Sequence, residues 1–260
     1  MDQTDWCVKR AWRVFPSVAA EPATDFRIEG GGEPTVVLLS GLGDDLRTWD
    51  PIVDRLSGDC TMFRYSRPGY GRSSPVRHGK GGRDGEFVAT HLKTCLETVG
   101  PMPPYVMVGH SMGGLYALCF ARLFRELVSG LVLIDPRASG FSTECKRSGL
   151  SSEPHWCLKL MLPYHVRAEI RGATAAERQA IIPDRLEEIP VAPLSISTRP
   201  KGFSPPLFDA WRQAQREFVD KLPRRRLIVV DDCGHYIHQE QPGLVSKAII
   251  ELCDRLRVER

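Results

Sequence analysis

The stretch YVMVGHSMGG, residues 105–114, decides the fold of this 260-residue chain. It opens on an apolar run without polar alternation, which predicts a strand covered on both faces. The pentapeptide G-x-S-x-G, residues 109–113, follows at once, and a helix is predicted over Met112–Leu127. A strand, this pentapeptide and a helix in that order are typical of a sharp turn that lifts the hydroxyl of Ser111 clear of the sheet edge.

Similar apolar runs alternate with amphipathic segments of helical length along most of the chain. This alternation predicts an α/β fold with a mostly parallel eight-stranded sheet flanked by helices. The predicted strands are Ala11–Phe15, Asp25–Ile28, Thr35–Leu39, Thr61–Tyr65, Tyr105–Val108, Gly130–Ile134, Pro193–Ser197 and Arg226–Val230. The predicted helices are Leu46–Leu56, Gly85–Val99, Met112–Leu127, Leu207–Leu222 and Pro242–Arg257.

Residues 137–192 interrupt that alternation. No segment among them has the pattern of a core strand, and their apolar and aromatic residues come in clusters, such as Trp156-Cys157-Leu158. We therefore expect residues 1–136 and 193–260 to form the core domain. The inserted residues 137–192 are expected to form a small helical lid over one end of the sheet.

Composition narrows the function classes. The chain has 35 Lys and Arg against 32 Asp and Glu, and its net charge of +3 is too small to indicate nucleic acid or an anionic membrane as a partner. Its apolar runs are too short for a membrane span, and its first residues lack the pattern of a signal peptide. The eight cysteines show no metal-ligand spacing. We expect reduced thiols, a cytoplasmic protein and no bound metal, with the oligomeric state open.

A serine hydroxyl is a weak nucleophile until a base removes its proton, so a histidine must approach Ser111. His235 follows the predicted strand Arg226–Val230 and is therefore expected in a loop at the same carboxyl edge of the sheet. We expect His235 to be this base. His110 is expected to pack beside the turn, and His238 to be a surface group or a neighbour of the base.

Four motifs, in the same order along the chain, resemble those of the α/β-hydrolase superfamily. They are Ser40–Gly43 with Trp49, Arg67–Ser73 (RPGYGRS), Gly109–Gly114 (GHSMGG), and Gly234–Ile237 with Gln241-Pro242. Ser40 stands where many members have histidine. The resemblance covers nearly the whole chain. It implies the α/β-hydrolase fold and a serine esterase-like or lipase-like member that needs no cofactor.

The resemblance also implies the remaining catalytic groups. The backbone N–H groups of Leu42 and Met112 would form the oxyanion hole for a tetrahedral intermediate. Many relatives place the acid that orients the histidine after the seventh strand, where this chain has no acid before Asp209. Asp135 ends the sixth predicted strand, at a position that some lipase-like members use. We favour Asp135 and retain Asp209 as the alternative acid.

Together these residues predict hydrolysis of a small-molecule carboxylic ester through an acyl-enzyme intermediate. Gly41 and the lid residues Trp156, Met161 and Tyr164 would contribute to the substrate pocket. Lactonases, thioesterases, amidases, C–C bond hydrolases, perhydrolases and acyltransferases use the same triad and remain alternatives. A ligand-binding protein of this fold without catalysis is a further alternative, because Ser40 and the acid position depart from the family pattern.

Overall fold

The computed structural model describes residues 23–77, 79–180, 194–197, 204–221, 226–230 and 233–258. Its strands are β1 (Phe26–Gly30), β2 (Thr35–Leu39), β3 (Thr61–Tyr65), β4 (Tyr105–His110), β5 (Val128–Ile134), β6 (Leu194–Ser197) and β7 (Arg226–Val229). These residues form a seven-stranded sheet with the order β1-β3-β2-β4-β5-β6-β7. β1 is antiparallel to β3, and the other neighbouring strands are parallel.

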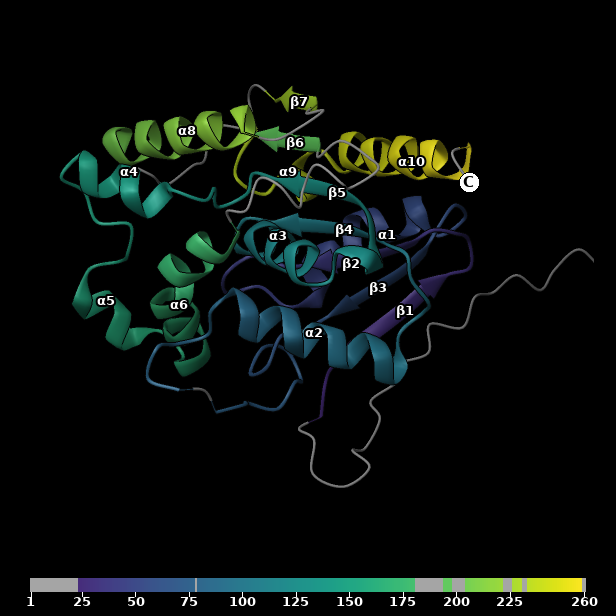
Figure 1. Ribbon diagram of the computed structural model, residues 1–260, viewed down its shortest axis with the longest axis horizontal. Helices are drawn as coiled ribbons and strands as arrows, with labels where there is room; N and C mark the ends of the chain where they lie inside the picture. The colour runs from purple at the N-terminus through teal and green to yellow at the C-terminus, as the bar shows by residue number, and fades with distance from the viewer. Residues whose placement is uncertain are drawn as a thin grey trace, which may run out of the picture.

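Helices enclose the sheet on both faces (Figure 1). On one face, α2 (Gly85–Val99), α3 (Met112–Leu123) and α8 (Pro205–Asp220) contribute to a single apolar core. On the other face, α1 (Asp50–Leu56) and α10 (Pro242–Val258) contribute to a second core. The sheet is therefore the middle layer of three.

The central strands supply side chains to both cores. In β2, Val37 faces the core of α2 and α3, whereas its neighbour Val36 faces the core of α1 and α10. Met107 and Val106 of β4 divide in the same way, and all four side chains are fully buried. Because both faces need apolar residues, these strands show continuous apolar runs instead of alternation.

The predicted fold class is confirmed as a mostly parallel sheet flanked by helices. The predicted strand Ala11–Phe15 lies outside the described residues, so the structure describes seven strands where eight were expected. The predicted helix Leu46–Leu56 is divided into a 3-10 helix, η1 (Leu46–Trp49), and α1. Pro51 in the first turn of α1 explains the division, because proline lacks an N–H and favours a helix start.

One further helix prediction needs correction, and one helix was missed. The predicted helix Met112–Leu127 ends at Leu123, and a short 3-10 turn, η2 (Arg125–Leu127), follows it. Phe124 between them leaves helical backbone angles, with φ −128° and ψ +53°. The short helix α9 (Ile237–Glu240) was not predicted. It has four residues, which is too short for a clear hydrophobic period.

The insert between β5 and β6 contains α4 (Phe141–Arg147), α5 (Trp156–Met161) and α6 (Tyr164–Ala180). They lie at the end of the molecule to which the parallel strands point (Figure 1). α6 packs against α2 and α3. The loop before α2 also approaches α6 closely, because a Cβ at Gly172 would lie 2.1 Å from the carbonyl oxygen of Arg83. In contrast, α5 buries none of its residues, so the insert combines a helix fixed to the core with an exposed one.

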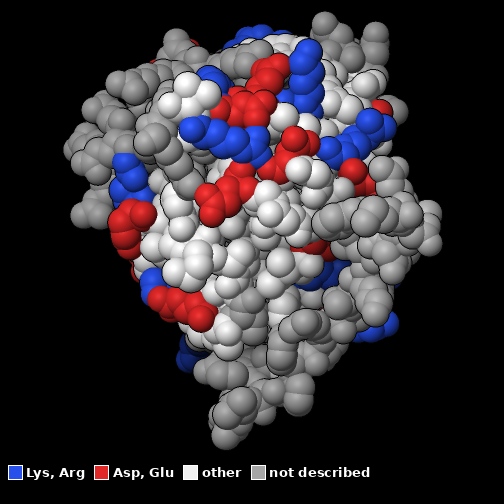
Figure 2. Space-filling view, turned by 90° about the vertical axis from the view of Figure 1, so that its right-hand side faces the viewer, with Lys and Arg blue, Asp and Glu red and all other residues white. Residues whose placement is uncertain are grey.

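The opposite end of the molecule carries acidic and basic side chains close together (Figure 2). No extended surface of one sign is visible on this face, in keeping with the small net charge of +3. Long-range attraction of a highly charged partner needs such a surface. In the part of the chain that the structure describes, no helix is both long and apolar enough to cross a membrane.

Candidate active site

Ser111 occupies a strained turn between the end of β4 and the start of α3. Its backbone has φ +53° and ψ −117°, which a residue with a side chain adopts at a cost. The turn is held by its neighbours: the N–H of Ser111 donates to the carbonyl of Ile134, and its carbonyl accepts from the N–H of Arg137, both at 3.0 Å. Gly113 is needed for close packing, because a Cβ there would lie 2.0 Å from the carbonyl oxygen of Leu39.

His235 and Asp135 meet at this same edge of the sheet. The Nδ1 of His235 lies 2.6 Å from Oδ2 of Asp135, whose side chain is fully buried. The other carboxylate oxygen, Oδ1, accepts from Trp211 Nε1 at 3.2 Å and from Gln215 Nε2 at 2.8 Å. A carboxylate acceptor at Nδ1 keeps the proton on that nitrogen, which leaves Nε2 of His235 able to accept a proton.

The alternative acid Asp209 is not brought to His235. It lies on the exposed side of α8, between the buried residues Phe208 and Ala210. The buried side of the same helix instead carries Trp211 and Gln215, the two donors to the Asp135 carboxylate. Sequence reasoning missed these two donors, although a glutamine four residues after a tryptophan on a buried helix face was the available signal.

His110 connects the serine turn to the histidine loop. Its imidazole is 1% exposed, and its Nε2–H donates to the carbonyl of His235 at 2.9 Å. The two imidazole rings lie 4.6 Å apart. Within the described residues, no hydrogen bond joins Ser111 Oγ to His235. Catalytic hydrogen bonds are often long without substrate and shorten only in the reacting complex, so this arrangement is compatible with a serine–histidine pair.

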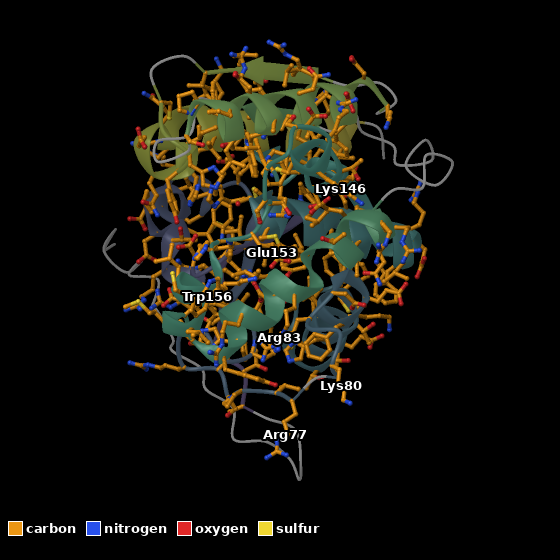
Figure 3. All side chains as sticks on the ribbon, turned by 90° about the vertical axis from the view of Figure 1, so that its left-hand side faces the viewer. Arg77, Lys80, Arg83, Lys146, Glu153 and Trp156 are labelled. Atoms are coloured by element: carbon orange, nitrogen blue, oxygen red, sulfur yellow. The ribbon has the colours of Figure 1, made fainter. Side chains whose placement is uncertain are left out.

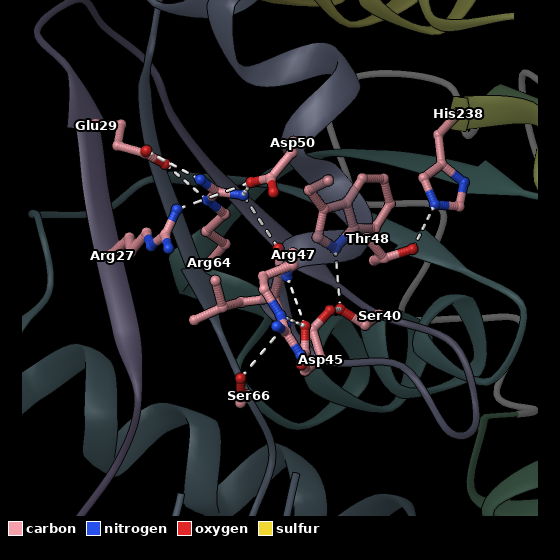
Figure 4. A network of polar contacts seen from close by, with 12 residues as sticks. Arg27, Glu29, Ser40, Asp45, Arg47, Thr48, Asp50, Arg64, Ser66 and His238 are labelled. Atoms are coloured by element: carbon pink, nitrogen blue, oxygen red, sulfur yellow. Dashed lines mark hydrogen bonds and ion pairs between the residues drawn. The ribbon is translucent and has the colours of Figure 1, made fainter. Parts of the chain in front are cut away.

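The loop of residues 40–43, here called the oxyanion loop, follows β2 beside the serine turn. Leu42 in this loop is half-buried, and Met112 opens α3 directly after Ser111. The N–H groups in the first turn of a helix have no partner within that helix, and they favour a neighbouring negative charge. Ser40 anchors the start of the loop, because its Oγ accepts from Trp49 Nε1 at 3.1 Å (Figure 4).

The four residues expected in the substrate pocket have different surroundings. Gly41 is buried, and a Cβ there would lie 2.8 Å from Nδ1 of His110. Trp156, Met161 and Tyr164 are 65%, 83% and 46% exposed. Trp156 lies at the outer surface of the insert (Figure 3). The structure therefore does not enclose these three side chains in a pocket: Trp156 and Met161 belong to α5, which buries none of its residues, and Tyr164 is the half-exposed first residue of α6.

His110 and His238 are buried, and His91 is half-buried. Oδ2 of Asp44 lies 4.0 Å from Nδ1 of His110. Nε2 of His238 lies 3.0 Å from Oγ1 of Thr48 (Figure 4), and its ring lies 4.6 Å from that of His110. Burial lowers the pKa of His238 to about 3, and it lowers the pKa of His110 well below its usual value, with neighbouring histidines adding to both effects. Burial and Arg83 lower the pKa of His91 to about 4. These imidazoles are neutral at pH 7.

We expect the free energy of unfolding to decrease as the pH falls below about 6.5, because the unfolded chain then protonates these histidines and the folded chain does not. Each adds a slope of up to about 1.4 kcal/mol per pH unit. For His238 the loss continues down to its folded pKa of about 3. His238→Gln keeps a polar atom near Thr48 and removes one of these titrating groups. Urea unfolding curves between pH 7 and pH 5 should therefore show a smaller decrease of the unfolding free energy per pH unit in this variant. Equal slopes in the wild type and in His238→Gln would contradict the prediction.

The described residues gather no cluster of three or more side chains that could hold a metal ion. What they bring together is a serine in a strained turn, a histidine hydrogen-bonded to a buried carboxylate, and a loop and a helix start that carry backbone N–H groups. Nucleophile, base and electrostatic stabiliser are the three components that acyl transfer requires. The chemistry open to this arrangement is therefore nucleophilic attack on a carbonyl group.

Comparison with known proteins agrees with this arrangement. The model of the alpha/beta hydrolase family matches residues 36–248. An uncharacterized protein of Bacillus subtilis is 24% identical over 230 residues, which cover 86% of this chain and 85% of that protein. The (lyso)-N-acylphosphatidylethanolamine lipase of Mus musculus is 36% identical over 104 residues, and the pimeloyl-[acyl-carrier protein] methyl ester esterase of Yersinia enterocolitica 34% over 111 residues. These two matches cover 39% and 42% of this chain, but 30% and 39% of those proteins.

Solved structures show the same fold. A thermophilic esterase from Thermogutta terrifontis has a TM-score of 0.64 at 21% identity, over 95% of this chain and 98% of that one. A serine hydrolase from Cycloclasticus zankles has a TM-score of 0.68 at 16% identity, over 95% of this chain and 99% of that one. At such identities the likeness concerns the fold alone. Since the family model matches most of the sequence and the sheet topology agrees with it, the chain belongs to the alpha/beta hydrolase family, as the four sequence motifs predicted.

Proposed function

We propose that this hydrolase cleaves small carboxylic esters through an acyl-enzyme intermediate. Ser111 is the nucleophile, His235 the general base and acid, and Asp135 the acid that orients His235. The observation that carries the proposal is the 2.6 Å contact from His235 Nδ1 to a fully buried carboxylate at the sheet edge where Ser111 is raised. A carboxylate buried with three donors is well suited to hold one imidazole tautomer in one orientation.

The reaction follows from these positions. Nε2 of His235 takes the hydroxyl proton as Ser111 Oγ attacks the ester carbonyl. The N–H groups of Leu42 and Met112 stabilise the negative charge that develops on the carbonyl oxygen. His235 returns the proton to the departing alcohol, and a water molecule activated by the same histidine then releases the acid. The lipase and esterase among the sequence relatives support esters as the substrate class.

A fluorophosphonate probe tests the nucleophile directly, because it forms a covalent adduct with activated serines and not with ordinary ones. We expect a single adduct on the peptide that contains Ser111, located by mass spectrometry. Acid-unfolded protein provides the control, since its serines are no longer activated. An adduct on another serine, or none in the folded protein, would contradict the proposal. A panel of esters, thioesters, lactones and amides then identifies the substrate class.

A further inference from the structure

A carboxylate of the insert forms a buried ion pair with the core domain. Glu169 of α6 is fully buried, and Arg67, in the turn after β3, is 2% exposed. The Nε of Arg67 donates to Oε1 of Glu169 at 2.7 Å, and its Nη2 donates to Oε2 at 3.0 Å. This is the bidentate geometry of a strong arginine–carboxylate pair. It joins two segments that lie 102 residues apart in the sequence.

The same guanidinium also holds the backbone of the oxyanion loop. Its Nη1 donates to the carbonyl of Ser40 at 2.6 Å, and its Nη2 donates to the carbonyl of Gly41 at 2.7 Å. Arg67 therefore has acceptors on both sides, with the Glu169 carboxylate on one and two loop carbonyls on the other. Its charge is neutralised within the protein by Glu169, which allows it to stay buried beside the loop.

Tyr70 adds a second connection between Glu169 and the loop. Its hydroxyl donates to Oε2 of Glu169 at 3.1 Å and accepts from the N–H of Gly43 at 3.5 Å. The side chain of Leu42 packs against the apolar cluster of Tyr70, Val166 and Ile170, of which the last two belong to α6. The loop thus contacts α6 directly through Leu42 and indirectly through the two partners of Glu169.

The hydrogen bond to Gly41 has a direct consequence for the proposed oxyanion hole. The carbonyl of Gly41 and the N–H of Leu42 belong to one planar peptide unit and point in opposite directions. When Arg67 fixes the direction of this carbonyl, it also fixes the direction of the N–H. A donor to an oxyanion must be aimed before the charge develops, because its value lies in needing no reorganisation during the reaction.

We propose that Glu169 is a positioning residue for the oxyanion loop. Through Arg67 and Tyr70 it holds the peptide between Gly41 and Leu42 in the orientation that directs the N–H of Leu42 to the developing charge. The insert thereby sets the catalytic geometry of the core domain. The catalytic part of this inference rests on the proposed function, whereas the structural part, the ordering of the loop by Glu169, can be measured without any substrate.

The test compares Glu169→Gln with a matched variant, Glu29→Gln. Glu29 also forms a bidentate pair with a buried arginine, Arg64, at 2.7 and 2.9 Å (Figure 4). That pair joins β1 to β3, so its loss controls for the general effect of breaking a buried ion pair. In Glu169→Gln we expect faster backbone hydrogen exchange in a peptide that covers the oxyanion loop. Glu29→Gln should not change exchange there.

Ester turnover provides the second measurement. We expect kcat of Glu169→Gln to fall at least about tenfold, towards the roughly 10²-fold loss of one oxyanion donor, with KM changed by less than about threefold. Glu29→Gln should keep the wild-type kcat. If Glu169→Gln does not fold, Tyr70→Phe removes the hydroxyl contacts to Glu169 and Gly43 alone, and it should show the same exchange and kcat changes in smaller degree.

Each outcome decides the inference. Faster loop exchange with a reduced kcat supports it, and unchanged exchange or an unchanged kcat in Glu169→Gln overturns it. A kcat loss of equal size in Glu29→Gln also overturns it, since the effect would then come from stability alone. If the wild-type protein hydrolyses no ester, the proposed function fails. The hydrogen exchange of the loop then decides by itself whether Glu169 positions it.

Discussion

The variant Ser111→Ala is expected to lose ester turnover, with kcat lower by about 10⁶-fold, as for the nucleophile of other serine hydrolases. The proposed acyl-enzyme forms on the Oγ of this one residue, and alanine offers no atom that could replace it. Any remaining acceleration over water would come from the oxyanion hole and from substrate binding. The measurement is steady-state hydrolysis of a short-chain aryl ester by purified protein.

The structure supplies a matched control for this variant. Ser129 in β5 is 8% exposed, compared with 9% for Ser111, and its hydroxyl donates to the carbonyl of Tyr105. Ser129→Ala therefore also removes a hydroxyl from a buried serine, but away from His235. It should retain turnover. Because alanine keeps the Cβ, Ser111→Ala leaves the strain of the turn unchanged, and circular dichroism should show an intact fold. Turnover at the wild-type rate in Ser111→Ala would contradict the proposed acyl-enzyme mechanism.

Much of the fold could be predicted because local signals agree with the tertiary structure. The bounds of β2, β3 and α2 match the predicted strands Thr35–Leu39 and Thr61–Tyr65 and the predicted helix Gly85–Val99. The start of α2 is also fixed locally, since the carboxylate of Asp84 accepts from the N–H of Phe87 at 2.9 Å. Such signals depend on residues a few positions apart, which a single sequence displays.

The site was harder to predict because its contacts span long distances in sequence. The spacing of Phe208, Trp211 and Phe218 indicates the buried face of α8 and leaves Asp209 off it. No local pattern, however, indicates that Asp135 lies beside His235. Trp211 and Gln215 reach Asp135 across 76 and 80 residues. Trp156, Met161 and Tyr164 were expected to line a substrate pocket because their side chains are apolar or aromatic. The exposure of α5 shows that apolar character alone does not decide burial.

The variant Asp135→Asn is expected to lower kcat by about 10⁴-fold, the effect of the same change in serine proteases. The surrounding donors explain why the loss should be so large. Trp211 Nε1 and Gln215 Nε2 both donate to Oδ1, so the carboxamide oxygen of the asparagine would take that position. Its NH₂ group would then face Nδ1 of His235 and donate to it. The imidazole must respond by carrying its proton on Nε2, where it can no longer accept the proton of Ser111.

Asp209→Asn is the matched control, because it makes the same chemical change on the exposed side of the helix that carries both donors. Its kcat should stay within about twofold of the wild type, as expected for a substitution at an exposed position. Equal mild losses in the two variants would show that neither aspartate orients His235.

A third variant, Gln215→Leu, tests the orientation of the Asp135 carboxylate separately from its charge, because it removes one donor to Oδ1 and keeps the carboxylate. A loss of kcat smaller than that of Asp135→Asn is therefore expected, since the tautomer of His235 is unchanged while its partner is less firmly held.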